Sequence, residues 1–200
     1  SQIWLDETET LTVHEMLKAI CVVSANDCCV AMAEHISGST EEFVNLMNER
    51  ANQLGMNQTT NKNCHGLDEE GHLTTAKDIA IMSKELITKH PKILEYTTIW
   101  MDSLRNGQSE LVNTNKLINF YEGADGLKTG FTDNAGYCMA VTAKRGDMRL
   151  IAIVLGEKEG KVRNKEVASL LDYGFNVYEV KTIKKKGDIV GETYFDKADN

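Results

Sequence analysis

Three residues that could do chemistry together, Lys128, Thr129 and Gly130, stand just before an alternating apolar run that predicts a strand. The lysine places a cation where it could serve a nucleophile and a carboxylate, and the threonine hydroxyl could bind a terminal carboxylate. Because Gly130 has no side chain, the backbone of an extended peptide could approach closely and add to the strand. The alternative interpretation is an exposed lysine and threonine at a strand start, without any chemistry.

A second short pattern, Ser24-Ala25-Asn26, interrupts an otherwise helical stretch far upstream. On a tight junction between two helices, Ser24 and Asn26 can point together into a cleft. The serine could then relay a proton, and the asparagine could bind a substrate amide. Serine and asparagine are also common N-cap residues, so the alternative is a helix start with no further role.

Helices are predicted on both sides of this junction. Apolar residues recur at helical spacing over 11–23, and a second apolar helix runs to about Ile36. Ser39 has capping-box chemistry for a third helix, which Gly55 ends, and Thr75 caps a fourth. The same periodicity predicts an inward face with Ile79, Met82 and Leu86 on the fourth helix. On the helix predicted over 161–178, it predicts an inward face that includes Val167, Leu170 and Leu171.

The second half of the chain changes to short strands. The Asn-Gly pair at 106–107 is a strong hairpin signal. Residues 126–131, 136–144 and 148–155 predict three strands, of which the last two should pair antiparallel, and 161–178 predicts a covering helix. Helices first, then an antiparallel sheet and a helix to cover it, indicate an α+β fold. Three strands are few for a sheet that serves so many helices.

Composition narrows the class of protein. Apolar residues at 42% and charged residues at 26% are ordinary for a soluble domain, and 200 residues suffice for one core. The net charge of −8 and the lack of a basic patch argue against a nucleic-acid partner. No apolar stretch is long enough to span a membrane. Neither the histidines nor the cysteines have metal spacing, so no metal or cofactor is expected, and we predict reduced thiols at Cys21, Cys28, Cys29, Cys64 and Cys138.

Taken together, the two patterns resemble two of three signatures of the serine acyl-transferases that recognise D-Ala-D-Ala: Ser-x-x-Lys, Ser-x-Asn and Lys-Thr-Gly. From Leu11 to about Val180 the chain resembles the low-molecular-weight penicillin-binding proteins, which are serine-type D-Ala-D-Ala carboxypeptidases. The resemblance implies a β-lactamase/transpeptidase-like fold. The segments that agree in order and distance are 11–18, 24–27, 43–55, 65–68, 75–78, 113–115 and 125–131.

The resemblance implies a mechanism in which a serine attacks the carbonyl between two terminal D-alanines of a peptidoglycan stem peptide. D-Ala leaves, and water hydrolyses the acyl-enzyme. β-Lactam antibiotics would acylate the same serine. The site residues that it assigns are Ser24, Asn26 and Lys128 as catalytic groups and Thr129, Gly130 and Phe131 as substrate-binding groups.

Each implied role is specific. Ser24 would relay the proton, Asn26 would bind the substrate backbone, and Lys128 would orient Ser24 and raise the local positive potential. Thr129 would bind the D-Ala carboxylate, and the backbone N–H of Phe131 would be one oxyanion-hole donor. Two departures are minor: an alanine replaces the usual glycine between the serine and the asparagine, and a phenylalanine follows Lys-Thr-Gly where some relatives carry histidine.

The third signature is absent, because no lysine of the chain has a serine three positions before it. In the family this segment lies upstream of the position that corresponds to Ser1. We therefore expect residues 1–180 to be an incomplete catalytic domain, inactive by itself, and 181–200 to begin a truncated β-rich domain. The alternative is a non-catalytic module that binds peptidoglycan peptides or serves wall assembly. A β-lactamase would need a deacylating glutamate, for which Glu69 and Glu70 are the candidates.

The family also predicts partners and location. Its members work outside the cytoplasmic membrane in the cell envelope, and the usual C-terminal membrane anchor is not in this chain. In the family, two strands that precede the nucleophile pair beside the strand expected at 148–155. Their absence would leave a bare edge, so we expect that edge to pair with a second copy in a homodimer.

Overall fold

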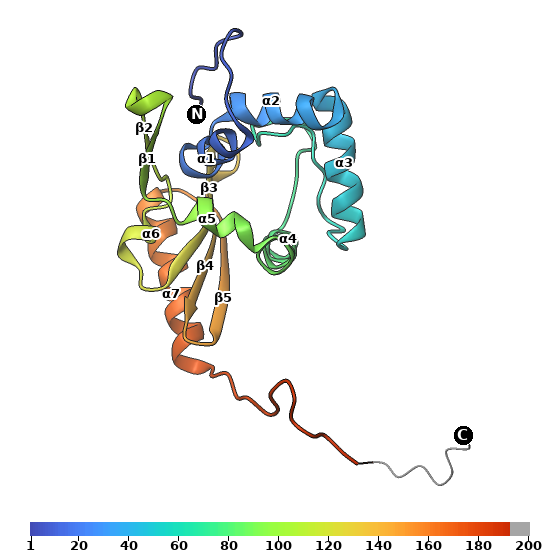
Figure 1. The fold of residues 1–200 in the computed structure, drawn as a ribbon, viewed down its shortest axis with the longest axis vertical. Coiled ribbons are helices and arrows are strands. Elements are labelled where there is room, and N and C mark those ends of the chain that lie inside the picture. Colours follow the sequence, from blue (N-terminus) through green and yellow to red (C-terminus); the bar gives the residue numbers. More distant parts are fainter. Residues whose placement is uncertain (193–200) are drawn as a thin grey trace, which may run out of the picture.

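The structure is a computed structural model that describes residues 1–192 of the chain. The first half is helical, and α1, α2 and α3 gather at one end of the molecule (Figure 1). The elements of this half are α1 (Val13–Val23), α2 (Asn26–Ser37), α3 (Thr40–Gln53), α4 (Ala76–Lys89), a 3-10 turn (Pro91–Ile93) and α5 (Leu94–Thr97).

Capping residues in the sequence set the ends of several helices. Thr12 and Glu15 form a complete capping box at the start of α1, and the Thr-x-x-Glu spacing in the sequence is its local signal. The predicted caps of α3 and α4 are confirmed, because the hydroxyls of Ser39 and Thr75 each accept the backbone N–H three residues on. Gly55 follows α3 with φ +76°, a conformation that side-chain-bearing residues rarely adopt.

The second half contains two antiparallel sheets. The Asn-Gly hairpin is confirmed as a two-stranded sheet, and the three predicted strands form a second sheet in the order β3–β4–β5. The elements are β1 (Met101–Leu104), a 3-10 turn (Arg105–Gly107), β2 (Ser109–Val112), α6 (Leu117–Phe120), β3 (Ala124–Thr132), β4 (Gly136–Arg145), β5 (Met148–Glu157) and α7 (Gly160–Val177).

Two apolar clusters hold these layers. One lies between α1, α2 and the hairpin and contains Ile3, Ala19, Val22, Ala25, Cys28, Leu104 and Leu111. The other lies between the three-stranded sheet and α7, which runs along it in Figure 1, and contains Leu117, Met139, Val141, Ala143, Ala152, Val167 and Leu171. Gly174 allows α7 to approach closely, because a Cβ there would meet Leu150 Cδ1 at 2.5 Å. Helices, an antiparallel sheet and a covering helix confirm the predicted α+β class.

Two inward-face predictions are wrong. Met82 of α4 is 40% exposed and Leu170 of α7 is 48% exposed. The buried stripe of α7 runs through Arg163, Val167 and Leu171, so Leu170 lies one position away from it. Met82 faces a hollow that the described residues do not fill.

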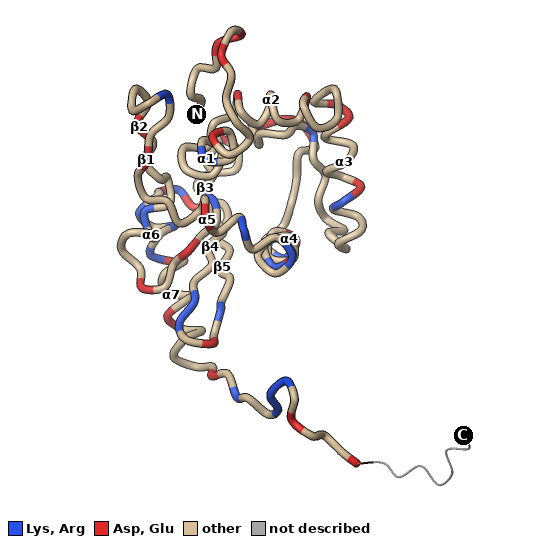
Figure 2. The backbone as a smooth tube through the Cα atoms, in the orientation of Figure 1, with Lys and Arg blue, Asp and Glu red and all other residues tan. Residues whose placement is uncertain are grey.

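Figure 2 shows acidic and basic positions interspersed over the helices and the sheet. None of the helices within residues 1–192 could cross a membrane. Residues 181–192 form no helix or strand, and 193–200, where the predicted further domain would continue, lie outside the described residues.

One ion pair fixes the start of β3 across the whole sheet. Arg149 of β5 donates to both carboxylate oxygens of Asp125 at 2.8 and 2.7 Å and to the Thr142 hydroxyl at 2.8 Å. Both charged side chains are largely buried. The pair therefore connects β3, β4 and β5 at the end where the Lys-Thr-Gly strand begins.

We predict that Arg149→Met lowers the free energy of unfolding by about 2 kcal/mol, because it leaves the Asp125 carboxylate largely buried without a partner. Arg50→Met is the matched control, since it breaks the more exposed Arg50–Glu85 pair and should cost less than about 1 kcal/mol. Urea unfolding of both variants measures the difference. Equal losses in the two variants would contradict the role given to Arg149.

Candidate active site

The junction between α1 and α2 holds Ser24 and Asn26. Ser24 ends α1 in the left-handed region, with φ 62° and ψ 46°. A residue other than glycine seldom adopts this conformation, and such residues gather at functional sites. Asn26 begins α2, and its backbone N–H donates to the Ser1 carbonyl at 2.8 Å.

The N-cap interpretation of this junction is wrong. The N-cap of α2 is Ala25, which makes no side-chain hydrogen bond. The neighbouring Asp27 carboxylate instead accepts the backbone N–H groups of Ile3 at 3.1 Å and Leu5 at 3.1 Å. The carboxylate therefore binds the N-terminal segment across the junction.

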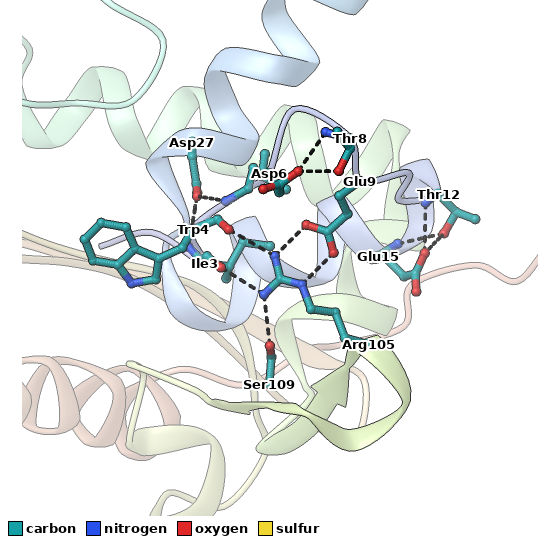
Figure 3. Close-up of polar contacts among 11 residues, drawn as sticks. Ile3, Trp4, Asp6, Thr8, Glu9, Thr12, Glu15, Asp27, Arg105 and Ser109 are labelled. Atoms are coloured by element: carbon teal, nitrogen blue, oxygen red, sulfur yellow. Dashed lines mark hydrogen bonds and ion pairs between the residues drawn. The ribbon is translucent and has the colours of Figure 1, made fainter.

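Arg105 holds the same segment from the hairpin side, as Figure 3 shows. Its guanidinium donates to the Ile3 carbonyl at 2.9 Å and to both carboxylate oxygens of Glu9 at 2.5 and 2.6 Å. It also donates to the Ser109 hydroxyl at 2.9 Å. The first residues of the chain are thus fixed over the Ser24 junction by charges on both sides.

Lys128 lies in β3 with its ammonium largely enclosed. Burial lowers the pKa of Lys128 to about 8, and the nearby thiols of Cys21 and Cys29 partly oppose this shift. Burial also raises the pKa of each of these thiols to about 11, so both are neutral at pH 7. The Lys128 Nζ donates to the Thr129 carbonyl at 2.7 Å. A lysine with this pKa can hold or release a proton close to neutral pH.

Thr129 connects β3 to the helical half of the molecule. Its hydroxyl donates to the Thr114 hydroxyl at 2.7 Å, and the Thr114 backbone N–H donates to the Val22 carbonyl at 3.1 Å. Val22 lies in the last turn of α1, two residues before Ser24. Thr114 therefore connects the two sequence patterns that the resemblance had paired.

Two buried asparagines fix the position of Thr114. Asn113 donates to the carbonyls of Thr97 at 3.2 Å and Ile99 at 2.7 Å. Asn115 donates to the Gly126 carbonyl at 3.2 Å, which lies two residues before Lys128 in β3. In the sequence, residues 113–115 stand out only through the family resemblance. The one signal in the sequence was two asparagines two positions apart after a strand.

A hollow of about 550 Å³ lies beside β3. Lys128, Thr129, Gly130 and Phe131 line it together with the loop 66–68, α4 and the Leu155 end of β5. Phe131 is 54% exposed, and its ring lies 4.4 Å from that of Tyr137. A second hollow, of about 570 Å³ and mostly apolar, lies between α3 and α4 and shares its border with the first.

Among the described residues, only some of the predicted site residues lie close together. The four residues of β3 line one hollow, which Ser24 and Asn26 do not line. Within residues 1–192 no hydrogen bond joins Ser24 to Lys128. Glu69 and Glu70 do not line the hollow, and the Glu69 carboxylate accepts from Asn63 at 3.0 Å. The five cysteines form no disulfide among the described residues; Cys21 and Cys28 are buried, and the other three are half-buried.

Solved structures define the class of protein. Penicillin-binding protein 5 from Haemophilus influenzae superposes with a TM-score of 0.84 at 34% identity, over 88% of this chain and 51% of that one. Penicillin-binding protein D2 from Listeria monocytogenes, in its ampicillin-bound form, gives 0.80 at 36% identity, over 87% of this chain and 72% of that one. The fold is therefore that of the low-molecular-weight penicillin-binding proteins.

Sequence comparison then gives the family. The D-alanyl-D-alanine carboxypeptidase model matches residues 1–159. D-alanyl-D-alanine carboxypeptidase DacF of Bacillus subtilis is 48% identical over 201 residues, which cover 99% of this chain and 51% of that protein. The chain belongs to the D-alanyl-D-alanine carboxypeptidase family, as the resemblance implied. It spans about half the length of the curated relatives it matches.

We predict that burial of Lys128 makes stability depend on pH. An ordinary lysine in the unfolded chain has a pKa of 10.5, and the folded value is about 8. Between these values the unfolded chain binds more protons, so stability rises with pH by up to about 1.4 kcal/mol per unit. Wild type should therefore gain stability relative to Lys128→Met from pH 8 to 10.

The matched control is Lys84→Met on the exposed face of α4. Wild type and this control should show parallel changes in the free energy of unfolding over the same pH range. A pH-independent difference between wild type and Lys128→Met would mean that the Lys128 pKa is not lowered.

Proposed function

We propose that this chain is part of a serine-type D-Ala-D-Ala carboxypeptidase that removes the terminal D-Ala from peptidoglycan stem peptides through an acyl-enzyme. The observation that carries the proposal is the Thr129–Thr114–Val22 connection, which joins the Lys-Thr-Gly strand to the Ser24 junction. Relatives with this fold or with similar sequence are named D-alanyl-D-alanine carboxypeptidases, which supports the proposal.

In this proposal β3 binds the substrate. An extended stem peptide lies along the strand in the hollow, where Gly130 lets its backbone approach, and the Thr129 hydroxyl binds its terminal carboxylate. The backbone N–H of Phe131 donates to the oxyanion. The exposed ring of Phe131 forms an apolar border to this site.

The remaining roles concern protons. Lys128, whose pKa of about 8 allows it to keep a proton at neutral pH, supplies positive potential and orients Ser24. Ser24 relays a proton to the leaving amine, and Asn26 binds a substrate amide. The left-handed backbone of Ser24 supports this proposal, because strain of that kind is retained where a side chain must be aimed.

The nucleophile itself needs a Ser-x-x-Lys segment, which the 200 residues do not contain. We propose that the segment comes from another part of the same protein and that residues 1–180 are the rest of its catalytic domain. Residues 181–200 would begin the next, β-rich unit. By itself the chain would bind substrate without cleaving it, since removal of the nucleophile from such enzymes removes most of the rate gain.

The proposed partners follow from the site. They are the stem peptide and β-lactams, and ampicillin- and cefotaxime-bound forms of the Listeria relative support the second. The proposed location is the cell envelope outside the cytoplasmic membrane, where peptidoglycan lies. Membrane association of the whole protein is part of the same proposal.

The test is intact-mass spectrometry after incubation with benzylpenicillin. We expect no adduct on the 200-residue chain and one adduct on the full-length protein of the same reading frame. An adduct on the short chain would make one of its own serines, Ser24 first, the nucleophile. If neither protein forms an adduct, the carboxypeptidase proposal is wrong and the non-catalytic peptide-binding module is favoured instead.

A further prediction concerns the outer edge of β5, which pairs with no strand among the described residues. We propose that this edge pairs with a second copy. Leu155→Lys, on β5, should then shift the dimer to monomer in sedimentation velocity, while Leu170→Lys, exposed on α7, should not. A wild-type chain that is monomeric at high micromolar concentration would exclude this dimer.

A further inference from the structure

The Arg105 guanidinium donates five hydrogen bonds, which is the number of N–H donors that it has. Two go to the Glu9 carboxylate, one to the Ser109 hydroxyl, and the others to the carbonyls of Ile3 at 2.9 Å and Trp4 at 3.3 Å. Figure 3 shows the guanidinium at the centre of these contacts. The charged side chains of Arg105 and Glu9 are largely buried. A planar fork with every donor used holds its partners in one arrangement.

The same short segment, residues 3–5, is held from α2 by its other backbone groups. Asp27 accepts the N–H groups of Ile3 and Leu5, while Arg105 binds the carbonyls of Ile3 and Trp4. Trp4 has φ 59°, a left-handed conformation that is uncommon without glycine. The Ile3 side chain is 7% exposed and packs in the cluster between α1, α2 and the hairpin. The segment is therefore a fixed bridge from the hairpin to the start of α2.

This bridge leads to the backbone of Asn26. The first N–H groups of a helix have no partner within the helix, and Asn26 is the first residue of α2. The N-cap residue Ala25 makes no side-chain hydrogen bond. The Ser1 carbonyl accepts the Asn26 N–H at 2.8 Å instead. The N-terminal segment thus fixes the backbone from which the Asn26 side chain projects.

We propose that Arg105 is a positioning residue for Asn26, which it holds in place through residues 1–5. The inference rests on the proposed function, because Asn26 is the group that binds a substrate amide there. Arg105 itself does not line the hollow beside β3. Without its guanidinium the carbonyls of Ile3 and Trp4 lose their donor and the Glu9 carboxylate loses its partner. Ser1 then no longer holds the Asn26 N–H in one place.

The first test is hydrogen exchange of the Asn26 backbone amide, measured by NMR on the 200-residue chain. Arg105→Met should make this exchange at least about tenfold faster, because the hydrogen bond to Ser1 opens more often. Arg145→Met is the matched control. Arg145 also donates to a backbone carbonyl, that of Glu122 at 3.2 Å, and lies over the Tyr121 ring near the β4–β5 turn. The control should leave the exchange of Asn26 unchanged, and unchanged exchange in Arg105→Met would overturn the inference.

The second test is the rate at which benzylpenicillin acylates the full-length protein of the same reading frame. Benzylpenicillin carries an amide of the kind that Asn26 is proposed to bind. Arg105→Met should slow acylation about tenfold, the effect of one misplaced hydrogen bond. Arg145→Met should leave the rate unchanged. Thermal unfolding shows that both variants are folded, so a general loss of stability cannot explain a difference between them.

A double-mutant cycle shows whether Arg105 acts through Asn26. Asn26→Ala should slow acylation by itself, and Arg105→Met should add no further loss in that background. In a Thr129→Val background Arg105→Met should still slow acylation about tenfold, because Thr129 lies on β3 and not on the bridge. If Arg105→Met costs the same factor with and without the Asn26 side chain, it acts by another route and the inference is overturned.

Other outcomes distinguish the inference from the function on which it rests. If Asn26→Ala slows acylation and Arg105→Met does not, the inference is overturned and the proposed function stands. If the unchanged protein forms no adduct, or Asn26→Ala acylates at the unchanged rate, the proposed function or its role for Asn26 is wrong, and the inference with it.

A milder variant covers the case in which Arg105→Met does not fold. Glu9→Gln keeps the guanidinium and removes one charge of the pair. It should change the Asn26 exchange rate and the acylation rate in the same directions by a smaller factor, again only while the Asn26 side chain is present for acylation. No change in either rate would overturn the inference.

Discussion

The side-chain amides of Asn113 and Asn115 are the contacts on which the rest of the structure depends. They donate to carbonyls of the α5 segment and of β3, and both side chains are almost completely buried. A buried carbonyl without such a partner costs about 1–3 kcal/mol, so the segment has one favourable conformation. Because Thr114 between them also bonds to α1 and to Thr129, this short turn sets the helical half and the sheet at a fixed distance.

Apolar packing alone would not give this arrangement. The two core clusters are separate, one under α1 and α2 and the other between the sheet and α7, and packing within each does not set the position of the other. Polar contacts span the gap, and Lys128 lies where the two halves meet. Its lowered pKa follows from this position, since partial burial disfavours the charged form of its ammonium. The same geometry that joins the halves therefore tunes the proposed catalytic lysine.

Much of the fold could be predicted because its signals are local. The Asn-Gly dipeptide predicted the hairpin, alternation predicted β3, β4 and β5, and the Ser39 and Thr75 caps predicted the starts of α3 and α4. The errors share a cause. Met82 and Leu170 fit the apolar period, yet which face of a helix is covered depends on its neighbours. Serine is a residue type that commonly caps helix N-termini, but Ser24 ends α1 instead. Its left-handed backbone is set by the junction between α1 and α2.

The elements, the class of fold and the Lys-Thr-Gly strand could all be predicted from local sequence signals, because periodicity, caps and turn dipeptides act over a few residues. Tertiary structure decided which side chains meet. Arg105 contacts Glu9 across 96 residues of chain, and Thr129 contacts Thr114 across 15 residues. Such contacts have no local signal, because they arise only when packing brings distant segments together and removes water from between them. For that reason the pairing of Thr114 with Thr129 became visible only in the folded chain.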